Sequence, residues 1–296
     1  MNKSRQKNIS VPRIVNLDGN FNVIRKGGSK FDWGDLYHAL LTLSWIKLFA
    51  VVGAGYIITN LLFALMYLTA GDGVENMREG NFSDAFFFSV QTMATIGYGA
   101  MHPKTLFANI LVAIEALLGL LGVSMGSGLV FARFSLPKAR VMFSRVAVIT
   151  LHDGVPTLMF RVANERQSWI LEAQVNVNLV VSEMTQEGEL MRKFYKLPLY
   201  RHHSSLFLLT WTVMHPINES SPLYNITLDE MLEKEMEILV TLTGIDQTVS
   251  DNIHTYHSYI PTDILWNHRF ADILSKTRDG RRSVDYNRFH DVVMLD

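Results

Sequence analysis

Two long, nearly uncharged stretches constrain this chain more than any other feature. The first runs from Leu48 to Ala70 without a charged residue, and the second runs from Leu106 to Val130 with Glu115 as its one ionisable residue. As a helix, each stretch is long enough to cross roughly 30 Å of hydrocarbon. A soluble protein would have to bury every face of both helices, which is rare. The sequence therefore predicts a protein that crosses a membrane twice.

Basic residues near the ends of these stretches predict their orientation. Lys47 precedes the first stretch, whereas Arg133, Lys138 and Arg140 follow the second. Because Lys and Arg accumulate on the cytoplasmic side, both termini are expected in the cytoplasm. The N-terminal region has no apolar run of signal-peptide length, so a cleaved export signal is not expected.

Composition argues against several classes of function. The net charge of -1 gives no general attraction to nucleic acid, so no nucleic-acid partner is expected. The absence of cysteine excludes disulfides and thiolate catalysis. The pairs His202-His203 and His254/His257 have no evident carboxylate partner or nucleophile motif, so neither an enzyme nor a resident cofactor is expected. These histidines are expected at the surface or in an interface, where their charge could make the protein sensitive to pH.

A shorter apolar segment, residues 82 to 94, lies between the two stretches. It is about three helical turns long, too short to span a bilayer, and Ser83 and Asp84 can cap its start. A re-entrant helix is the economical interpretation. Irregular backbone at membrane depth is tolerated only beside protein or a water-filled path, so the segment predicts a pore.

The sequence Thr95-Ile96-Gly97-Tyr98-Gly99 follows this segment directly. Loops of this kind, usually with Val at the second position, replace the hydration shell of K⁺ with backbone carbonyl oxygens from four chains. Glycine reaches the backbone angles that turn successive carbonyls the same way, which explains Gly97 and Gly99. Gly-Tyr-Gly alone is a weak signal, but its place between a re-entrant helix and a second span is specific. We expect a potassium filter in a homotetramer, with K⁺ bound by these carbonyls.

The segments on either side of the pore have different patterns. Residues 31 to 43 carry apolar side chains at helical spacing, which predicts a slide helix in the cytoplasmic membrane interface, and a helix packed on the soluble domain remains open. After Pro137, strand patterns dominate. They occur at 172–181, 206–214 and 238–243, with a turn at 186–188 and a short helix at 228–236 behind the capping-box residues Thr227 and Glu230.

These patterns predict a membrane α-helical pore domain, with two transmembrane helices and a re-entrant pore helix, followed by a mainly β cytoplasmic domain built as a two-sheet sandwich. The expected boundaries are a cytoplasmic N-terminal segment at 1–30, the slide helix at 31–43, the pore domain at 44–136 and the β domain at 137–296. Within the pore domain we expect the outer helix at 44–70, the pore helix at 83–94, the filter at 95–99 and the inner helix at 105–134.

Several passages resemble the inward-rectifier potassium channel family, most closely its bacterial branch, over about residues 12 to 293. They are Ala85 to Gly99, Ala132 to Lys138, Ser220 to Tyr224, Asp263 to Phe270 and Val284 to His290. The resemblance implies an immunoglobulin-like cytoplasmic domain from each of four subunits, K⁺ as the permeant ion and, for a bacterial member, the inner membrane.

The resemblance also implies the gating residues. Gly119 corresponds to a hinge glycine of the inner helix, and Phe131 to the bulky residue where the inner helices close. Val123, Ser127 and Phe131 stand four residues apart, so one helical stripe of the pore lining contains all three. Phe131 facing lipid or a neighbouring helix remains open. The turn at 246–250 corresponds to a second constriction in the cytoplasmic domain.

Departures from the family weaken the expectation of strong rectification. Strongly rectifying members carry an acid where this chain has Val123, and of two acids lower in the pore only Glu172 is kept, the other being Thr243. The resemblance thus implies weak rectification, with Mg²⁺ or polyamine block left possible through Glu172. The acid and arginine that brace the filter in animal members correspond to Gln91 and Met101.

Four basic residues are candidate contacts for anionic lipids of the surrounding bilayer: Lys47, Arg133, Lys138 and Arg140. Such residues attract anionic head groups by about 1 kcal/mol each, but ordinary positive-inside residues look the same in a sequence. A channel with a nucleotide-binding domain would need a Gly-rich phosphate loop that residues 142 to 296 lack. A non-conducting, membrane-anchored β-domain sensor or binding protein remains the alternative from another class.

Overall fold

The computed structural model describes residues 13–14, 22, 36–135, 139–276 and 279–295. The chain divides into two compact units, one formed by residues 27–136 and the other by residues 1–26 together with 137–296. Most of the predicted N-terminal segment, the start of the predicted slide helix and Lys138 lie outside the described residues.

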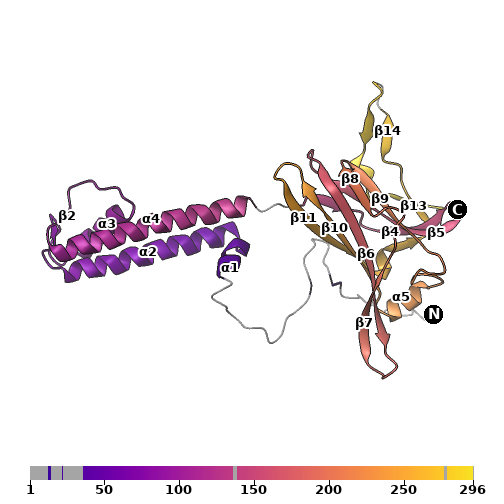
Figure 1. Ribbon diagram of the computed structural model, residues 1–296, viewed down its shortest axis with the longest axis horizontal. Coiled ribbons are helices and arrows are strands. Elements are labelled where there is room, and N and C mark those ends of the chain that lie inside the picture. The colour runs from indigo at the N-terminus through magenta and orange to yellow at the C-terminus, as the bar shows by residue number, and fades with distance from the viewer. Residues whose placement is uncertain (1–12, 15–21, 23–35, 136–138, 277–278, 296) are drawn as a thin grey trace, which may run out of the picture. The chain divides into compact units, whose positions relative to one another are not determined.

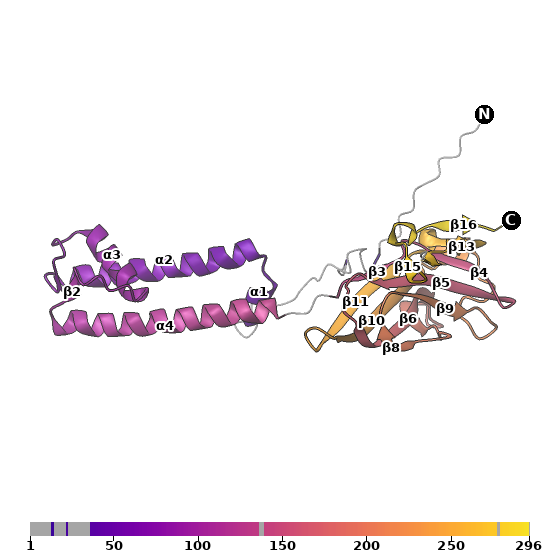
Figure 2. The same cartoon turned by 90° about the horizontal axis from the view of Figure 1, so that it is seen from above.

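The unit formed by residues 27–136, called the membrane unit below, is built mainly from helices (Figure 1). Its helices are α1 (Leu36–Thr42), α2 (Trp45–Thr69), α3 (Phe82–Met93) and α4 (Leu106–Phe134). A short antiparallel ladder joins β1 (Val74–Glu75) to β2 (His102–Pro103). In both views α2 and α4 lie side by side with α3 at one end (Figures 1 and 2). Within the described residues, α2 and α4 are the two helices long and apolar enough to span a membrane.

Side-chain caps explain where the three longer helices begin. Ser44, Asn81 and Thr105 accept hydrogen bonds from backbone N–H groups in the first turns of α2, α3 and α4. The predicted cap of the pore helix at Ser83 or Asp84 is therefore wrong. Asp84 lies inside the first turn of α3 and instead pairs with Arg78, whose Nε and Nη2 each lie 2.8 Å from a carboxylate oxygen.

The core of the membrane unit is small and lies where α3 meets the two long helices. It includes Phe63, Tyr67, Phe88, Met93 and Leu111. Most other apolar side chains of α2 and α4 are exposed in the single chain. Exposed apolar surface over whole helices is what a bilayer and neighbouring subunits would cover.

The second unit is mainly β and is built from two five-stranded sheets among the described residues. One sheet has the order β11-β10-β6-β7, with β8 also on β6: β6 (Ile170–Met184), β7 (Leu190–Lys196), β8 (His203–Phe207), β10 (Glu237–Asp246) and β11 (Asp251–Tyr259). The other has the order β12-β4-β5-β3, with β9 also on β5: β3 (Val141–Phe143), β4 (Ala147–His152), β5 (Val155–Asn164), β9 (Thr210–Pro216) and β12 (Ile264–Trp266).

Small elements complete this unit. They are α5 (Leu228–Glu233), the single turns η2 (Pro261–Asp263) and η3 (Tyr286–Arg288), and the paired strands β13 (His268–Phe270) with β16 (Val292–Met294) and β14 (Leu274–Lys276) with β15 (Arg282–Val284). One core joins the sheets, with Ile149 and Phe160 from one and Val177 and Val240 from the other. The predicted sandwich is thus observed.

Local details differ from the sequence patterns. The strand pattern at 206–214 is split, because β8 ends at Phe207 and β9 begins at Thr210. The capping box of Thr227 and Glu230 is present, but α5 ends at Glu233 rather than at 236. Glu235 has a φ of 45°, and this left-handed residue turns the chain out of the helix.

Candidate functional site

The segment from Thr95 to Gly99 leaves the end of α3 in an alternating backbone conformation. Thr95, Gly97 and Gly99 have φ angles of 55°, 58° and 82°, which are left-handed. Gly adopts such angles at little cost, whereas Thr95 must be held there. The amide of Thr95 donates to the Thr92 carbonyl at 3.0 Å, and that of Ile96 to the Gln91 carbonyl at 2.8 Å. The start of this segment is therefore anchored to the last turn of α3.

The far end of the segment is held by the loops beside it. The Asn76 side chain donates to the Ala100 carbonyl at 2.8 Å, and the Lys104 amide donates to the Gly73 carbonyl at 2.9 Å. The Lys104 ammonium also pairs with Asp72. With the β1–β2 ladder, these contacts fix residues 100 to 104 against the loop after α2. Both ends of residues 95–99 are thus anchored.

A buried polar cluster lies behind α3 and was not recognised in the sequence. Glu115 of α4, Ser89 of α3 and Asn60 of α2 are each fully buried, and Tyr67 of α2 joins them. The Tyr67 hydroxyl donates to Glu115 Oε2 at 2.6 Å, and Ser89 Oγ contacts both Glu115 Oε1 and Asn60 Oδ1. The only signal in the sequence was a single acid inside an apolar span, where ionisable residues are functional by default.

The predicted pore-lining stripe lies along α4. Val123 and Phe131 are 67% and 74% exposed in the single chain, and Ser127 is exposed between them. Together with Gly119 they border one open groove of about 940 Å³ along α2 and α4. The structure therefore brings the four predicted inner-helix residues to one surface. Gly119 is the exception in burial, because a Cβ there would overlap the Met93 carbonyl oxygen.

The four predicted lipid contacts are not equivalent. Lys47 and Arg140 are exposed. Arg133 is engaged within the membrane unit, because its Nη2 donates to the Leu43 carbonyl and its guanidinium lies 4.5 Å from the centre of the Trp45 ring. Arg133 thus ties the end of α4 to the corner between α1 and α2. Its Nη1 is buried without a hydrogen-bond partner among the described residues.

Glu172 lies at an irregularity of the first sheet. Its φ is 48°, and the ladder between β6 and β10 shifts register where Glu172 and Ala173 face Gly244. Glu172 Oε2 lies 2.7 Å from His203 Nε2, and both side chains are partly exposed. His203 thus has a carboxylate partner that was not evident from the spacing of residues around it. Residues 31 positions apart meet here through the pairing of β6 with β8.

The predicted second constriction is a braced turn between β10 and β11. Asp246 is buried and lies 2.7 Å from Arg166 Nη1. Its carboxylate accepts from the Thr248 amide at 2.8 Å, and its carbonyl accepts from the Ser250 amide at 2.8 Å. These bonds hold the conformation of residues 246 to 250.

His257 contradicts the expectation of surface histidines. It is 5% exposed, stacks on Phe143 with ring centres 4.9 Å apart, and has no hydrogen-bond partner for Nε2 among the described residues. Burial, together with the nearby Arg13 charge, lowers its pKa to about 4. His257 is thus a neutral core residue near pH 7.

Arg13 and Ile14 attach the N-terminal region to the β unit. Arg13 Nη2 lies 2.8 Å from Asp263, and the Ile14 amide donates to the buried Glu237 at 2.9 Å. These contacts join residues more than 200 positions apart, so no local pattern predicted them.

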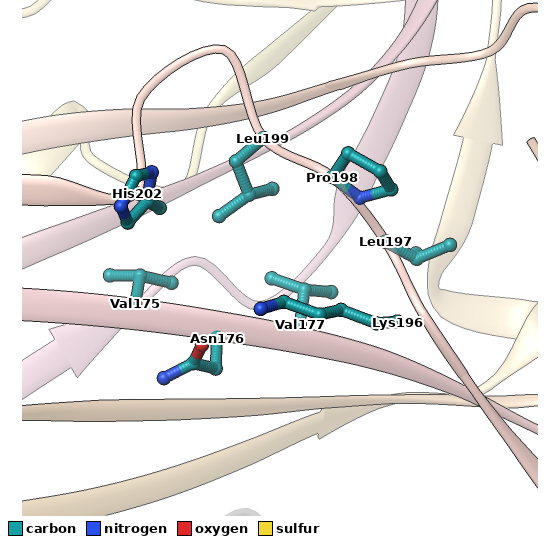
Figure 3. Close-up of a pocket in the computed structure, with 8 residues that line it drawn as sticks. All are labelled: Val175, Asn176, Val177, Lys196, Leu197, Pro198, Leu199 and His202. Atoms are coloured by element: carbon teal, nitrogen blue, oxygen red, sulfur yellow. The ribbon is translucent and has the colours of Figure 1, made fainter.

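A cavity of about 230 Å³ lies beside β6, where the chain passes from β7 to β8 (Figure 3). Apolar side chains such as Val175, Val177 and Leu199 form most of its wall. None of its polar lining residues, Asn176, Lys196 and His202, is buried. Without a buried polar group directed into it, the cavity gives no indication of a ligand. The described residues also contain no cluster of His, Asp and Glu able to hold a metal.

Comparisons with known proteins agree with this architecture. Residues 47–135 match the ion channel family, and residues 141–296 match the family of inward rectifier potassium channel C-terminal domains. The inward rectifier potassium channel Kirbac3.1 of Paramagnetospirillum magnetotacticum is 47% identical, over 95% of this chain and 96% of its own length. The mouse G protein-activated inward rectifier potassium channel 2 is 32% identical over 95% of this chain and 72% of its length.

The bovine G protein-activated inward rectifier potassium channel 4 is 34% identical over 87% of this chain and 66% of its length. These matches confirm the predicted fold class, with a two-helix pore domain before a mainly β domain, and they identify a membrane channel rather than an enzyme. The chain belongs to the inward rectifier potassium channel family.

Proposed function

We propose that four copies of this chain form a passive, potassium-selective pore whose filter is the backbone of residues 95–99. Channels of this family are tetramers. The observation that carries the proposal is the alternation of left-handed residues at Thr95, Gly97 and Gly99, at the end of a short helix between two spans. Such alternation aligns successive carbonyl oxygens on one side of the chain, where four copies replace the hydration shell of K⁺.

The inner helix supplies the proposed gate. Val123, Ser127 and Phe131 line the cavity below the filter, and four Phe131 rings close it as a hydrophobic constriction that gates by dewetting. The 74% exposure of Phe131 in the single chain supports this role, because the ring has no partner of its own subunit to bury it. The turn at 246–250 forms a second constriction in the cytoplasmic part of the pore.

Rectification is proposed to be weak. Val123 offers no negative charge to a cation trapped in the cavity, and Thr243 offers none lower in the pore. Glu172 is the remaining acid for Mg²⁺ or polyamine block. Its pairing with His203 supports weak block, because the imidazole already occupies one of the two carboxylate oxygens.

The surroundings of the pore follow from the same residues. Both termini lie in the cytoplasm of a bacterial cell, and α1 lies in the cytoplasmic interface of the inner membrane. Anionic head groups contact the exposed Lys47 and Arg140. Lys138, the remaining predicted lipid contact beside Arg133, lies outside the described residues. Arg133 contributes less to lipid binding, because its guanidinium is engaged with Leu43 and Trp45.

Flux measurements on the purified protein in liposomes test the proposal. K⁺ efflux is compared with Na⁺ efflux, in neutral liposomes and in liposomes with added anionic lipid. Potassium flux that exceeds sodium flux in at least one composition is expected. Absence of potassium-selective flux under every lipid composition would favour the non-conducting sensor.

A further inference from the structure

The protonation state of Glu115, the acid in the buried cluster behind α3, follows from assigning a donor hydrogen to each hydrogen bond of the cluster. The assignment starts from the Asn60 amide. Its Nδ2 lies 2.8 Å from the Tyr56 carbonyl oxygen, which can only accept, so this atom must be the amide nitrogen. The other amide atom, Oδ1, therefore faces Ser89 Oγ at 3.0 Å and needs a donated hydrogen. Ser89 has a single hydroxyl hydrogen, and Asn60 takes it.

Ser89 Oγ also contacts Glu115 Oε1 within hydrogen-bond distance. Since the Ser89 hydrogen is already used, this contact is a hydrogen bond only if Glu115 Oε1 carries a proton and donates it. Glu115 Oε2 is the acceptor for Tyr67 at 2.6 Å. Among the described residues, no lysine, arginine or histidine pairs with Glu115, and an unpaired buried carboxylate in a membrane span is costly. A neutral Glu115 gives every contact of the cluster a hydrogen.

The cluster contacts the buried face of α3 close to the end of the helix, where the proposed filter segment begins. Ser89 is on the buried face of α3 with Met93, and the Asn60 amide also lies 3.3 Å from Met93 Sδ. Met93 ends α3, and the amides of Thr95 and Ile96 are bonded to the last turn of that helix. A shift or rotation of α3 therefore displaces the first carbonyls of the filter. The hydrogen bonds of the cluster join α3 to both spanning helices.

We propose that Glu115, held in its protonated form, is a positioning residue for potassium selectivity, acting through Ser89 on the pore helix. The inference rests on the proposed filter at residues 95–99. Glu115 does not touch the ion. It donates to Ser89, accepts from Tyr67 and so fixes the depth and rotation of α3 under the filter.

Three variants test this inference in planar bilayers, by the K⁺/Na⁺ permeability ratio. In Glu115→Gln the amide N–H donates to Ser89 and the amide oxygen accepts from Tyr67, so the ratio is expected to stay within about twofold of wild type. Glu115→Leu and Ser89→Ala each break the link to α3. Both are expected to lower the ratio by about tenfold, the order associated with a buried polar group that loses its partner.

Infrared difference spectra between wild type and Glu115→Gln provide a readout that packing alone would not change. A carbonyl band of a protonated carboxyl group is expected in wild type and not in the variant. If that band is missing, or if Glu115→Gln loses selectivity like Glu115→Leu, the proton assignment is overturned.

The outcomes also distinguish a failure of this inference from a failure of the proposed filter. A wild-type protein without K⁺ selectivity would contradict the proposed function. A selective wild type whose Glu115→Leu and Ser89→Ala variants are equally selective would overturn the positioning role alone. Should Glu115→Leu fail to assemble, judged by the size of the purified protein, the smaller Ser89→Ala change decides the question.

Discussion

Gly119 offers a quantitative test of how α4 packs against the pore helix. In Gly119→Ala the new methyl group would overlap the Met93 carbonyl oxygen and lie 3.1 Å from Met93 Cγ and 3.2 Å from the Met93 carbonyl carbon. The oxygen belongs to the backbone at the end of α3, so it cannot rotate away as a side chain would. Overpacking of this kind costs about 1–3 kcal/mol per site, and four subunits would carry about 4–12 kcal/mol in total.

The matched control is Gly122→Ala, one turn further along α4. A Cβ at Gly122 meets nothing within 4 Å in the single chain, and alanine favours a helix over glycine by about 1 kcal/mol. Thermal dissociation of the purified oligomer and K⁺/Na⁺ selectivity are measured for both variants. We expect Gly119→Ala to dissociate at lower temperature and to select less well, while Gly122→Ala resembles wild type.

A hinge role for Gly119 makes a different prediction from a packing role. If Gly119 were needed only for bending, Gly119→Ala would alter channel opening. It would leave ion selectivity and the stability of the oligomer unchanged. If Gly119→Ala forms an oligomer as stable and selective as Gly122→Ala, the close approach of Gly119 to Met93 does not matter, and the packing argument is refuted.

Other residues allow shorter tests. Burial holds the pKa of His257 at about 4, below its ordinary 6.5, so the unfolded state binds the proton first and stability should fall by up to about 3 kcal/mol as pH drops from 6.5 to 4. His257→Phe should remove this dependence in thermal unfolding, and an unchanged slope would contradict it. Arg13→Leu should lower the unfolding free energy by about 2 kcal/mol through loss of the ion pair with Asp263. Its control, Arg288→Leu at an exposed ion pair, should change the unfolding free energy by less than about 1 kcal/mol. Equal effects of the two variants would argue against attachment of the N-terminal region through Arg13. Glu172→Gln should abolish any spermine block from the cytoplasmic side, and block that persists would exclude Glu172 as its site.

The sequence was most informative where neighbours along the chain determine structure. The two spans, the helix between them and the capping box at Thr227 depend on periodicity and on contacts within a few residues, and all are observed. The left-handed conformation of Gly97 and Gly99, in the proposed filter, was also predictable, because only glycine adopts those angles at little cost.

Contacts between distant residues were not predictable in this way. Glu115 meets Ser89 and Tyr67, which lie 26 and 48 positions away on two other helices. Glu172 meets His203 through a strand pairing and a bulge. Spacing within one segment says nothing about such partners, because the packing of helices and the register of strands bring them together.

The bi-ionic reversal potential of single channels in planar bilayers, with K⁺ on one side and Na⁺ on the other, tests the central claim most directly. If residues 95–99 form a potassium filter, the wild-type reversal potential should lie far from zero, with the sign that opposes the flow of K⁺ down its gradient. Gly97→Ala should lose this preference, because the φ of 58° costs an alanine roughly 1–2 kcal/mol in each of four chains. A wild-type reversal potential near zero, or a Gly97→Ala channel as selective as wild type, would contradict the account.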